Sequence, residues 1–205
     1  MGIRERLMLQ FGMPKGMLGR IAGFIMAHRS SNIERIEWAV AELDARAADC
    51  VLEIGFGPGI GIKMLSERIV EGKVYGIDHS PLMARKARGR NREAVDSGRV
   101  ELIVASSSRL PSFDRRIDKV LDINTFQFWD EPIRALLGLR AVLKPGGIIA
   151  IVHEPRQRGA TDQDTIDAGR RISETLEASG FEEVRQELRR MKPVSTVCVI
   201  GKNPA

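Results

Sequence analysis

The chain has 205 residues and a formal net charge of +5, with 43% hydrophobic and 29% charged residues. This is close to ordinary soluble usage, and the apolar runs stop well short of the roughly 20 residues that a membrane span needs. We therefore expect a soluble, cytoplasmic protein with no membrane span, built as one domain with a small appendage.

Charge and cysteine content restrict the partners and the chemistry. The positive balance admits nucleic acid as a partner without favouring it, because the densest basic stretch, Arg85 to Arg92, falls in a predicted helix and is explained most simply as a solvated face. Cys50 and Cys198 are each flanked by aliphatic residues. This indicates small buried side chains in strands rather than a disulfide, metal ligands or a nucleophile.

The first 30 residues differ from the rest of the chain. Between residues 3 and 28, Leu, Met, Ile and Phe are interrupted by Gly and Pro, which weaken a rigid helix, while Met adapts to varied shapes. We expect a mobile N-terminal helical lid over residues 1–30 and the main domain over residues 31–205. Ser30, Ser31 and Asn32 offer N-cap side chains to the first helix of that domain.

Strands and helices alternate between residues 50 and 153, which predicts a parallel sheet covered on both faces. Buried strands are expected where apolar runs are flanked by turn residues: Cys50 to Ile54, Lys73 to Ile77, Arg99 to Ala105, Ile117 to Ile123 and Gly147 to Val152. Helices are expected between them from about Ile60 to Val70, Pro81 to Asp96 and Glu131 to Leu143.

The last fifty residues predict a loop, a helix and a hairpin. After the polar segment 155–161, Thr161 or Asp162 caps a helix that Gly180 ends. Val184 to Met191 and Val194 to Gly201 then form two strands at the sheet's edge. The predicted fold class is α/β: a doubly wound, seven-stranded, mostly parallel sheet with an antiparallel C-terminal hairpin strand, helices on both faces and the N-terminal helical lid.

A glycine-rich loop follows the first predicted strand. Gly55, Gly57 and Gly59 let a ligand approach the backbone at the start of a helix. The dinucleotide fingerprint would need its third glycine at the position of Ile60. Glu53 places a negative charge near the expected ligand. This charge would repel a pyrophosphate group and would attract a ligand that carries a cation.

The segment from Val51 to Gly59 resembles the first motif of the class I (Rossmann-like) S-adenosylmethionine-dependent methyltransferases, in which an apolar strand and an acid precede G-x-G-x-G. The resemblance continues in order along the chain through Gly76 to Asp78, Leu110-Pro111, Asp118 to Asn124 and Leu143 to Gly147. It implies that residues 31–205 are a Rossmann-like methyltransferase domain and that the cofactor is S-adenosylmethionine, which becomes S-adenosylhomocysteine.

The resemblance also implies where the cofactor binds. Glu53 and the glycine loop would hold its methionine part, and Asp78 would accept from both ribose hydroxyls, although taken alone Asp78 could equally cap the next helix. Ser106 stands where many relatives have an acid for the adenine amino group. The full predicted set is Glu53, Gly55, Phe56, Gly57, Gly59, Asp78, His79, Ser80, Met83, Ser106, Ser107 and Asn124.

The acceptor side follows the fourth and fifth predicted strands. Asn124 to Pro132 resembles the N-x-x-x-x-W-x-[DE]-P segment of small-molecule methyltransferases. Phe126, Trp129 and, in the lid, Met17 are the predicted acceptor contacts, although each could simply cap the core. His153 and Glu154 are the predicted catalytic groups if the acceptor must lose a proton. Asp122 alone does not make a magnesium site, and we expect no metal.

These features favour methyl transfer to a small organic acceptor by a monomer or a homodimer. Asn124 to Gln127 lacks the [DNS]-P-P-[YFW] motif of amino-methylating nucleic-acid enzymes, and neither cysteine lies where a cytosine C5 enzyme needs one. Methylation of RNA or protein is an alternative that the positive charge permits. A non-catalytic S-adenosylmethionine- or NAD-binding regulatory protein is the alternative of another class.

Overall fold

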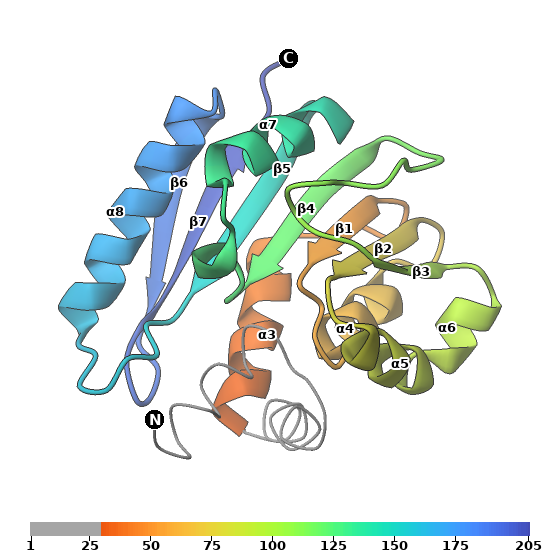
Figure 1. Cartoon of the computed structure of the whole chain (residues 1–205), viewed down its shortest axis with the longest axis horizontal. Coiled ribbons are helices and arrows are strands. Elements are labelled where there is room, and N and C mark those ends of the chain that lie inside the picture. The colour runs from red at the N-terminus through yellow and green to blue at the C-terminus, as the bar shows by residue number, and fades with distance from the viewer. Residues whose placement is uncertain (1–29) are drawn as a thin grey trace.

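Seven strands lie in the order β3-β2-β1-β4-β5-β7-β6 (Figure 1) in a computed structural model that describes residues 30–205. Strands β1 to β5 pair in parallel, and β7 runs antiparallel to both of its neighbours. This confirms the predicted α/β fold class with its seven-stranded, mostly parallel sheet. The strands are β1 (Cys50–Ile54), β2 (Lys73–Asp78), β3 (Val100–Val104), β4 (Ile117–Ile123), β5 (Leu143–His153), β6 (Glu182–Arg189) and β7 (Thr196–Lys202).

Helices cover both faces of the sheet. Side chains of β1 alternate between the two faces, so that Val51 packs in one apolar cluster with α3, α4 and α5, while Leu52 packs in a second cluster with α7 and α8. Burial on both faces explains the continuous apolar runs of the parallel strands. The helices are α3 (Ser30–Glu42), α4 (Ile60–Arg68), α5 (Pro81–Arg90), α6 (Arg92–Asp96), η1 (Phe126–Phe128), α7 (Pro132–Val142) and α8 (Asp162–Ala178).

Most predicted boundaries differ from the observed ones by one or two residues, and the following differences have a structural explanation or affect a predicted cap. The helix predicted from Pro81 to Asp96 is broken at Asn91, whose side-chain amide donates to the carbonyl oxygens of Ala87 and Gly59. Strand β5 begins earlier than Gly147, because Gly146 and Gly147 exchange backbone hydrogen bonds with Asn203. Residues 30–32, predicted to cap α3, lie inside its helical turns.

Thr161 caps α8 as predicted. Its hydroxyl accepts from the backbone N–H of Asp164, and the Asp164 carboxylate accepts from the backbone N–H of Thr161, which makes a reciprocal capping box. Gly180 then follows the helix with a φ of 80°, a left-handed conformation typical of the residue after a helix. Cys50 and Cys198 are free and buried, also as predicted.

The strand order reverses direction at β1. The chain leaves β1 for β2 and β3 on one side and returns to β4 on the other, and open α/β sheets bind ligands at the carboxyl ends of such neighbouring strands. Residues 1–29 of the predicted lid, Met17 included, lie outside the described residues. Within residues 30–205, none of the helices has the length and apolar character to cross a membrane.

Candidate functional site

The glycine loop between β1 and α4 has a left-handed backbone at all three glycines. The φ angles are 68° at Gly55, 51° at Gly57 and 81° at Gly59. A β-carbon at Gly55 would overlap the Thr125 side chain, and one at Gly59 would lie 2.7 Å from the Ala87 β-carbon. At Gly57 the nearest atom within residues 30–205 would be 4.0 Å away. Packing therefore fills the space beside the outer glycines, while Gly57 faces open space that a ligand can enter.

Asp78, the last residue of β2, holds this loop in place through hydrogen bonds. One carboxylate oxygen accepts from the backbone N–H of Gly57 and the other from that of Ser80, each at 2.8 Å. Burial raises the pKa of Asp78, and the two backbone hydrogen bonds and nearby His79 oppose that rise. A carboxylate has about four acceptor positions. Asp78 can therefore hold the loop and still accept hydrogen bonds from a ligand's hydroxyls.

Glu53 lies under the loop and is 4% exposed. Its carboxylate lies against Gly61 of α4, where a β-carbon would overlap it. Within residues 30–205, its Oε2 has no hydrogen-bond partner. Burial, followed by the charges of Asp122 and Asp78, raises the pKa of Glu53 well above its ordinary value. A buried acid without a partner is costly, and a cationic ligand group would offset that cost.

Several other predicted cofactor residues have structural tasks. The side chains of Phe56 and Met83 are buried in the apolar cluster of α3, α4 and α5. The Ser80 hydroxyl accepts from the backbone N–H of Met83 and so caps α5. These three residues can contribute backbone atoms to the site, and Ser80 its hydroxyl. His79 is exposed beside Asp78.

The predicted adenine end is a small turn after β3. The hydroxyl of Ser106 is exposed and lies 2.9 Å from that of Ser108, whose backbone N–H also approaches it at 3.3 Å. Ser107 between them is half-buried. A hydroxyl that is already bonded within its own turn is a weaker acceptor for adenine than a free carboxylate would be.

Two residues that hold the loop were not predicted. Asn91 donates to the carbonyl oxygen of Gly59 at 3.0 Å, and the Arg90 guanidinium donates to that of Pro58, also at 3.0 Å. Each contact joins residues 32 positions apart. The sequence shows only an asparagine inside a basic helical stretch, so no local pattern could have revealed these contacts.

Asp122 supports the loop from β4. It is fully buried and accepts from the Thr125 hydroxyl and from the backbone N–H groups of Thr125 and Phe126. Burial raises its pKa to about 7 against the effect of these hydrogen bonds. Because Thr125 packs on Gly55, Asp122 fixes the segment that closes one side of the loop.

Asn124 follows β4 with a φ of 58°, unusual for a residue other than glycine. Its side-chain oxygen accepts from the backbone N–H of Glu154 at 2.7 Å, while its Nδ2 is buried without a partner among the described residues. Phe126 and Trp129, just beyond, are partly buried with ring centroids 5.0 Å apart. The predicted acceptor contacts after β4 thus lie together, in the segment whose Thr125 packs on Gly55 of the loop.

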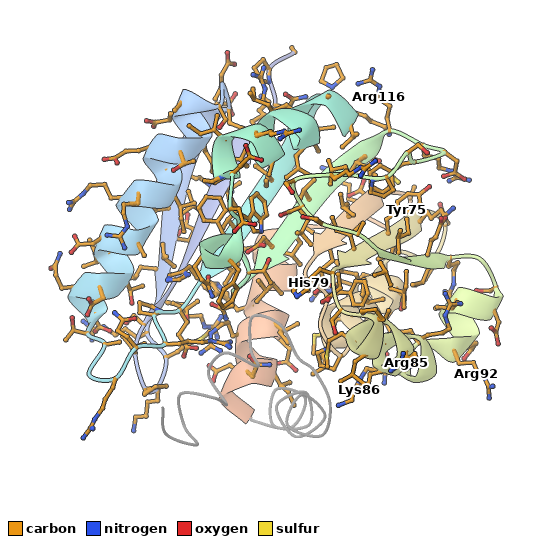
Figure 2. All side chains as sticks on the ribbon, in the orientation of Figure 1. Tyr75, His79, Arg85, Lys86, Arg92 and Arg116 are labelled. Atoms are coloured by element: carbon orange, nitrogen blue, oxygen red, sulfur yellow. The ribbon has the colours of Figure 1, made fainter. Side chains whose placement is uncertain are left out.

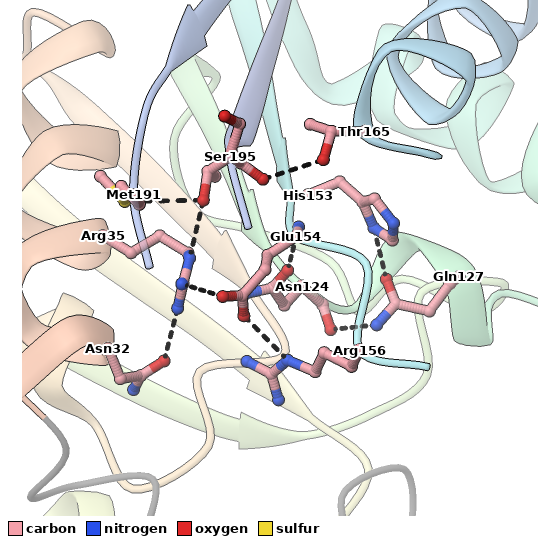
Figure 3. Close-up of polar contacts among 11 residues, drawn as sticks. Asn32, Arg35, Asn124, Gln127, His153, Glu154, Arg156, Thr165, Met191 and Ser195 are labelled. Atoms are coloured by element: carbon pink, nitrogen blue, oxygen red, sulfur yellow. Dashed lines mark hydrogen bonds and ion pairs between the residues drawn. The ribbon is translucent and has the colours of Figure 1, made fainter. Parts of the chain in front are cut away.

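The two predicted catalytic residues differ in their surroundings (Figure 3). The carboxylate of Glu154 forms a buried ion pair with Arg35 of α3, and Arg156 lies 3.6 Å from its other oxygen. His153 is half-buried, with Nδ1 3.1 Å from Gln127 Oε1. Burial, then Arg156 and Arg171, lowers the pKa of His153 to about 4. Glu154 is therefore a structural counter-ion here, and His153 is neutral at pH 7.

Arg35 was not predicted to have a role near the site. It is 2% exposed, and its Nε also donates to Thr196 Oγ1 of β7 at 3.1 Å. One arginine thus joins α3, the end of β5 and the start of β7. Glu154 and Thr196 lie 119 and 161 residues away from it in the sequence.

S-adenosylmethionine fits the groups assembled at this edge. Its ribose hydroxyls match the acceptor oxygens of Asp78, and its cationic methionine part matches Glu53, whose Oε2 has no partner within residues 30–205. The open face of Gly57 leaves room for it. Within residues 30–205, no three His, Cys, Asp or Glu side chains group as metal ligands.

Comparison with known proteins agrees with this assignment. Residues 52–151 match the model of the methyltransferase domain family. The uncharacterized methyltransferase YdaC of Bacillus subtilis (strain 168) is 32% identical over 185 residues, covering 90% of this chain and 99% of that protein. The ubiquinone/menaquinone biosynthesis C-methyltransferase UbiE of Geobacter sp. (strain M21) is 28% identical over 116 residues, which span 56% of this chain and 49% of that protein.

The fold has close counterparts among solved structures. A SAM-dependent methyltransferase from Aquifex aeolicus superposes with a TM-score of 0.70 at 23% identity, covering 86% of this chain and 95% of that one. The N-methyltransferase NodS from Bradyrhizobium japonicum WM9 gives 0.68 at 16% identity, covering 87% and 99%. Family match, relative and site together show that the chain belongs to the class I S-adenosylmethionine-dependent methyltransferases.

Proposed function

We propose that the protein methylates a small organic acceptor, bound where β4 and β5 end. The observation that carries this proposal is the aromatic pair Phe126 and Trp129, whose ring centroids lie 5.0 Å apart at 53°. The pair directly follows Thr125, which packs on Gly55 of the glycine loop. Both aromatic side chains are only partly buried. Partly open aromatic faces favour apolar bodies and cations, which suits a small organic molecule near a sulfonium.

In this proposal the chain's own residues bind and align the two substrates. Glu53, Asp78 and the glycine loop hold S-adenosylmethionine, which supplies an activated methyl group when bound. Phe126 and Trp129 orient the acceptor and exclude water, and alignment of this kind can lower a barrier by several kcal/mol. Asn124 directly follows β4, and its Nδ2, which has no partner within residues 30–205, can donate to the cofactor or to the acceptor.

Proton removal falls to His153 in this proposal rather than to Glu154. The Glu154 carboxylate is paired with Arg35 and Arg156, so taking up a proton would leave the buried Arg35 without its counter-ion. His153 is neutral at pH 7 and can accept a proton from an acceptor hydroxyl or amine.

The positions of the basic residues do not favour RNA as the methyl acceptor. Arg85, Lys86 and Arg92 lie on α5 and α6, on the β3 side of the sheet (Figure 2). The aromatic pair and His153 instead follow β4 and β5. The Geobacter relative is named as a C-methyltransferase of ubiquinone/menaquinone biosynthesis, which supports a small acceptor by analogy.

The acceptor class can be tested with methyl-labelled S-adenosylmethionine. The full chain is incubated separately with the low-molecular-mass, RNA and protein fractions of a cell extract. We expect label in the low-molecular-mass fraction and its loss in the Trp129→Ala variant. Label that enters only RNA or only protein would overturn the proposal.

A further inference from the structure

A chain of hydrogen bonds ends on the imidazole of His153 (Figure 3). Gln127, in η1, donates from Nε2 to the backbone carbonyl oxygen of Asn124 at 2.9 Å. Its Oε1 lies 3.1 Å from Nδ1 of His153, the last residue of β5. These contacts join two strand ends through a single amide side chain.

The direction of each bond follows from the donors available. A backbone carbonyl can only accept, so the amide nitrogen of Gln127 must face Asn124. The amide oxygen then faces His153, and because that oxygen can only accept, Nδ1 must carry the proton. In a neutral imidazole the other nitrogen, Nε2, is therefore the one with the free lone pair.

The carbonyl that sets this direction is itself fixed. The backbone N–H of Asn124 donates to the carbonyl oxygen of Val152 at 2.8 Å, and its side-chain oxygen accepts from the backbone N–H of Glu154. The Glu154 carboxylate is in turn held by buried Arg35 and by Arg156. Asn124 is thus anchored to both residues that flank His153.

We propose that Gln127 is a positioning residue that holds His153 in the Nδ1–H tautomer, so that Nε2 accepts the proton of a hydroxyl or amine acceptor. This rests on the proposed function. As the acceptor's O–H or N–H bond breaks, its proton moves to Nε2 and its electron pair stays on the heteroatom. The heteroatom then bonds the methyl carbon while the carbon–sulfur pair returns to sulfur.

The charges around His153 agree with this role. Burial, followed by the charges of Arg156 and Arg171, lowers the pKa of the imidazole and keeps it unprotonated near pH 7, so its base form is present before the acceptor binds. After transfer, the imidazolium faces two like charges and releases its proton readily to water, which its half-buried ring can reach.

The tautomer can be measured without any acceptor. Long-range ¹H–¹⁵N correlation spectra of the ¹⁵N-histidine-labelled full chain with S-adenosylhomocysteine report which ring nitrogen carries the proton, and the His153→Asn variant assigns the signal. We expect the Nδ1–H tautomer in the natural chain. Gln127→Met, similar in size but unable to accept strongly, should move most of the population to Nε2–H.

A charged variant gives a second readout. Gln127→Glu places a carboxylate beside Nδ1 and should raise the pKa of His153 by about 1 unit or more, moving the pH profile of methyl transfer the same way. Gln163→Met is the matched control, because Gln163 is an exposed glutamine of α8 whose side chain donates to Asp167 of the same helix. It should change neither readout.

The outcomes distinguish a failure of the role proposed for Gln127 from a failure of the proposed function. An Nε2–H tautomer in the natural chain, or an unchanged tautomer in Gln127→Met, overturns the role of Gln127 even if methyl transfer is normal. The expected tautomers together with label found only in RNA or protein leave the role of Gln127 standing and overturn the small acceptor.

Discussion

The backbone N–H of Gly57 donates to Oδ2 of Asp78 across 2.8 Å, joining the loop after β1 to the end of β2. The carboxylate proposed to bind ribose therefore also shapes the loop proposed to bind methionine. A substitution at Asp78 should therefore weaken the binding of both the ribose and the methionine parts of the cofactor.

Substituting Asp78 by Ala should weaken binding of S-adenosylhomocysteine at least tenfold, about 1.4 kcal/mol. The variant loses both the acceptor oxygens and the anchor of Gly57. Calorimetric titration measures the effect. Asp96→Ala, at an exposed residue of α6, is the control and should bind normally. Equal affinities for the two variants would refute the role of Asp78.

Gly57→Ala should reduce stability by about 1 to 2 kcal/mol, because φ is 51° there, and should also reduce cofactor affinity. Gly98→Ala is a matched control, since Gly98 has a φ of 78° and its β-carbon would likewise meet open space. Urea unfolding should show similar losses for both variants. Only Gly57→Ala should lose affinity for S-adenosylhomocysteine, and an equal loss in Gly98→Ala would mean that backbone strain alone explains the effect.

Arg35→Met should destabilise the fold by roughly 3 kcal/mol, because it leaves the buried Glu154 carboxylate without its main partner. The double variant Arg35→Met with Glu154→Gln should recover part of that loss in urea unfolding. Arg134→Met is the control: it breaks the exposed pair with Glu131, and such pairs contribute about 0 to 1 kcal/mol. A double variant less stable than Arg35→Met would contradict this account.

The raised pKa of Asp122 makes a signed prediction about pH. The folded protein keeps a proton on Asp122 up to about pH 7, whereas the unfolded chain releases it near the ordinary value of 3.8. The unfolded state therefore binds fewer protons in that window, and this carboxyl makes stability fall as pH rises through it. Asp122→Asn should remove that fall.

Urea unfolding at about pH 5 and about pH 8 tests the prediction. His153 acts in the opposite direction, since its pKa is lowered to about 4 and its contribution rises with pH. The two proteins compared, one with the natural Asp122 and one with Asp122→Asn, should therefore both carry His153→Gln. An identical pH dependence of the two would show that Asp122 keeps an ordinary pKa.

The sequence allowed us to predict the features that depend on residues close together in the chain. The buried strands appear as apolar runs, and the capping box at Thr161 and the glycine loop each lie within a few residues. It could not predict the contacts that fasten the site, because Arg35 meets Glu154 and Asn91 meets Gly59 only after the sheet has formed. We also predicted Phe56 and Met83 as cofactor residues, and their side chains are buried in an apolar cluster. The sequence alone does not distinguish an apolar side chain that faces a ligand from one that faces the core.

Calorimetric titration of the full chain with S-adenosylhomocysteine, and separately with NAD, tests the central claim most directly. The account predicts saturable binding of S-adenosylhomocysteine at one site per chain and none of NAD, because Glu53 lies where a pyrophosphate would be repelled. Binding of NAD without binding of S-adenosylhomocysteine would contradict it.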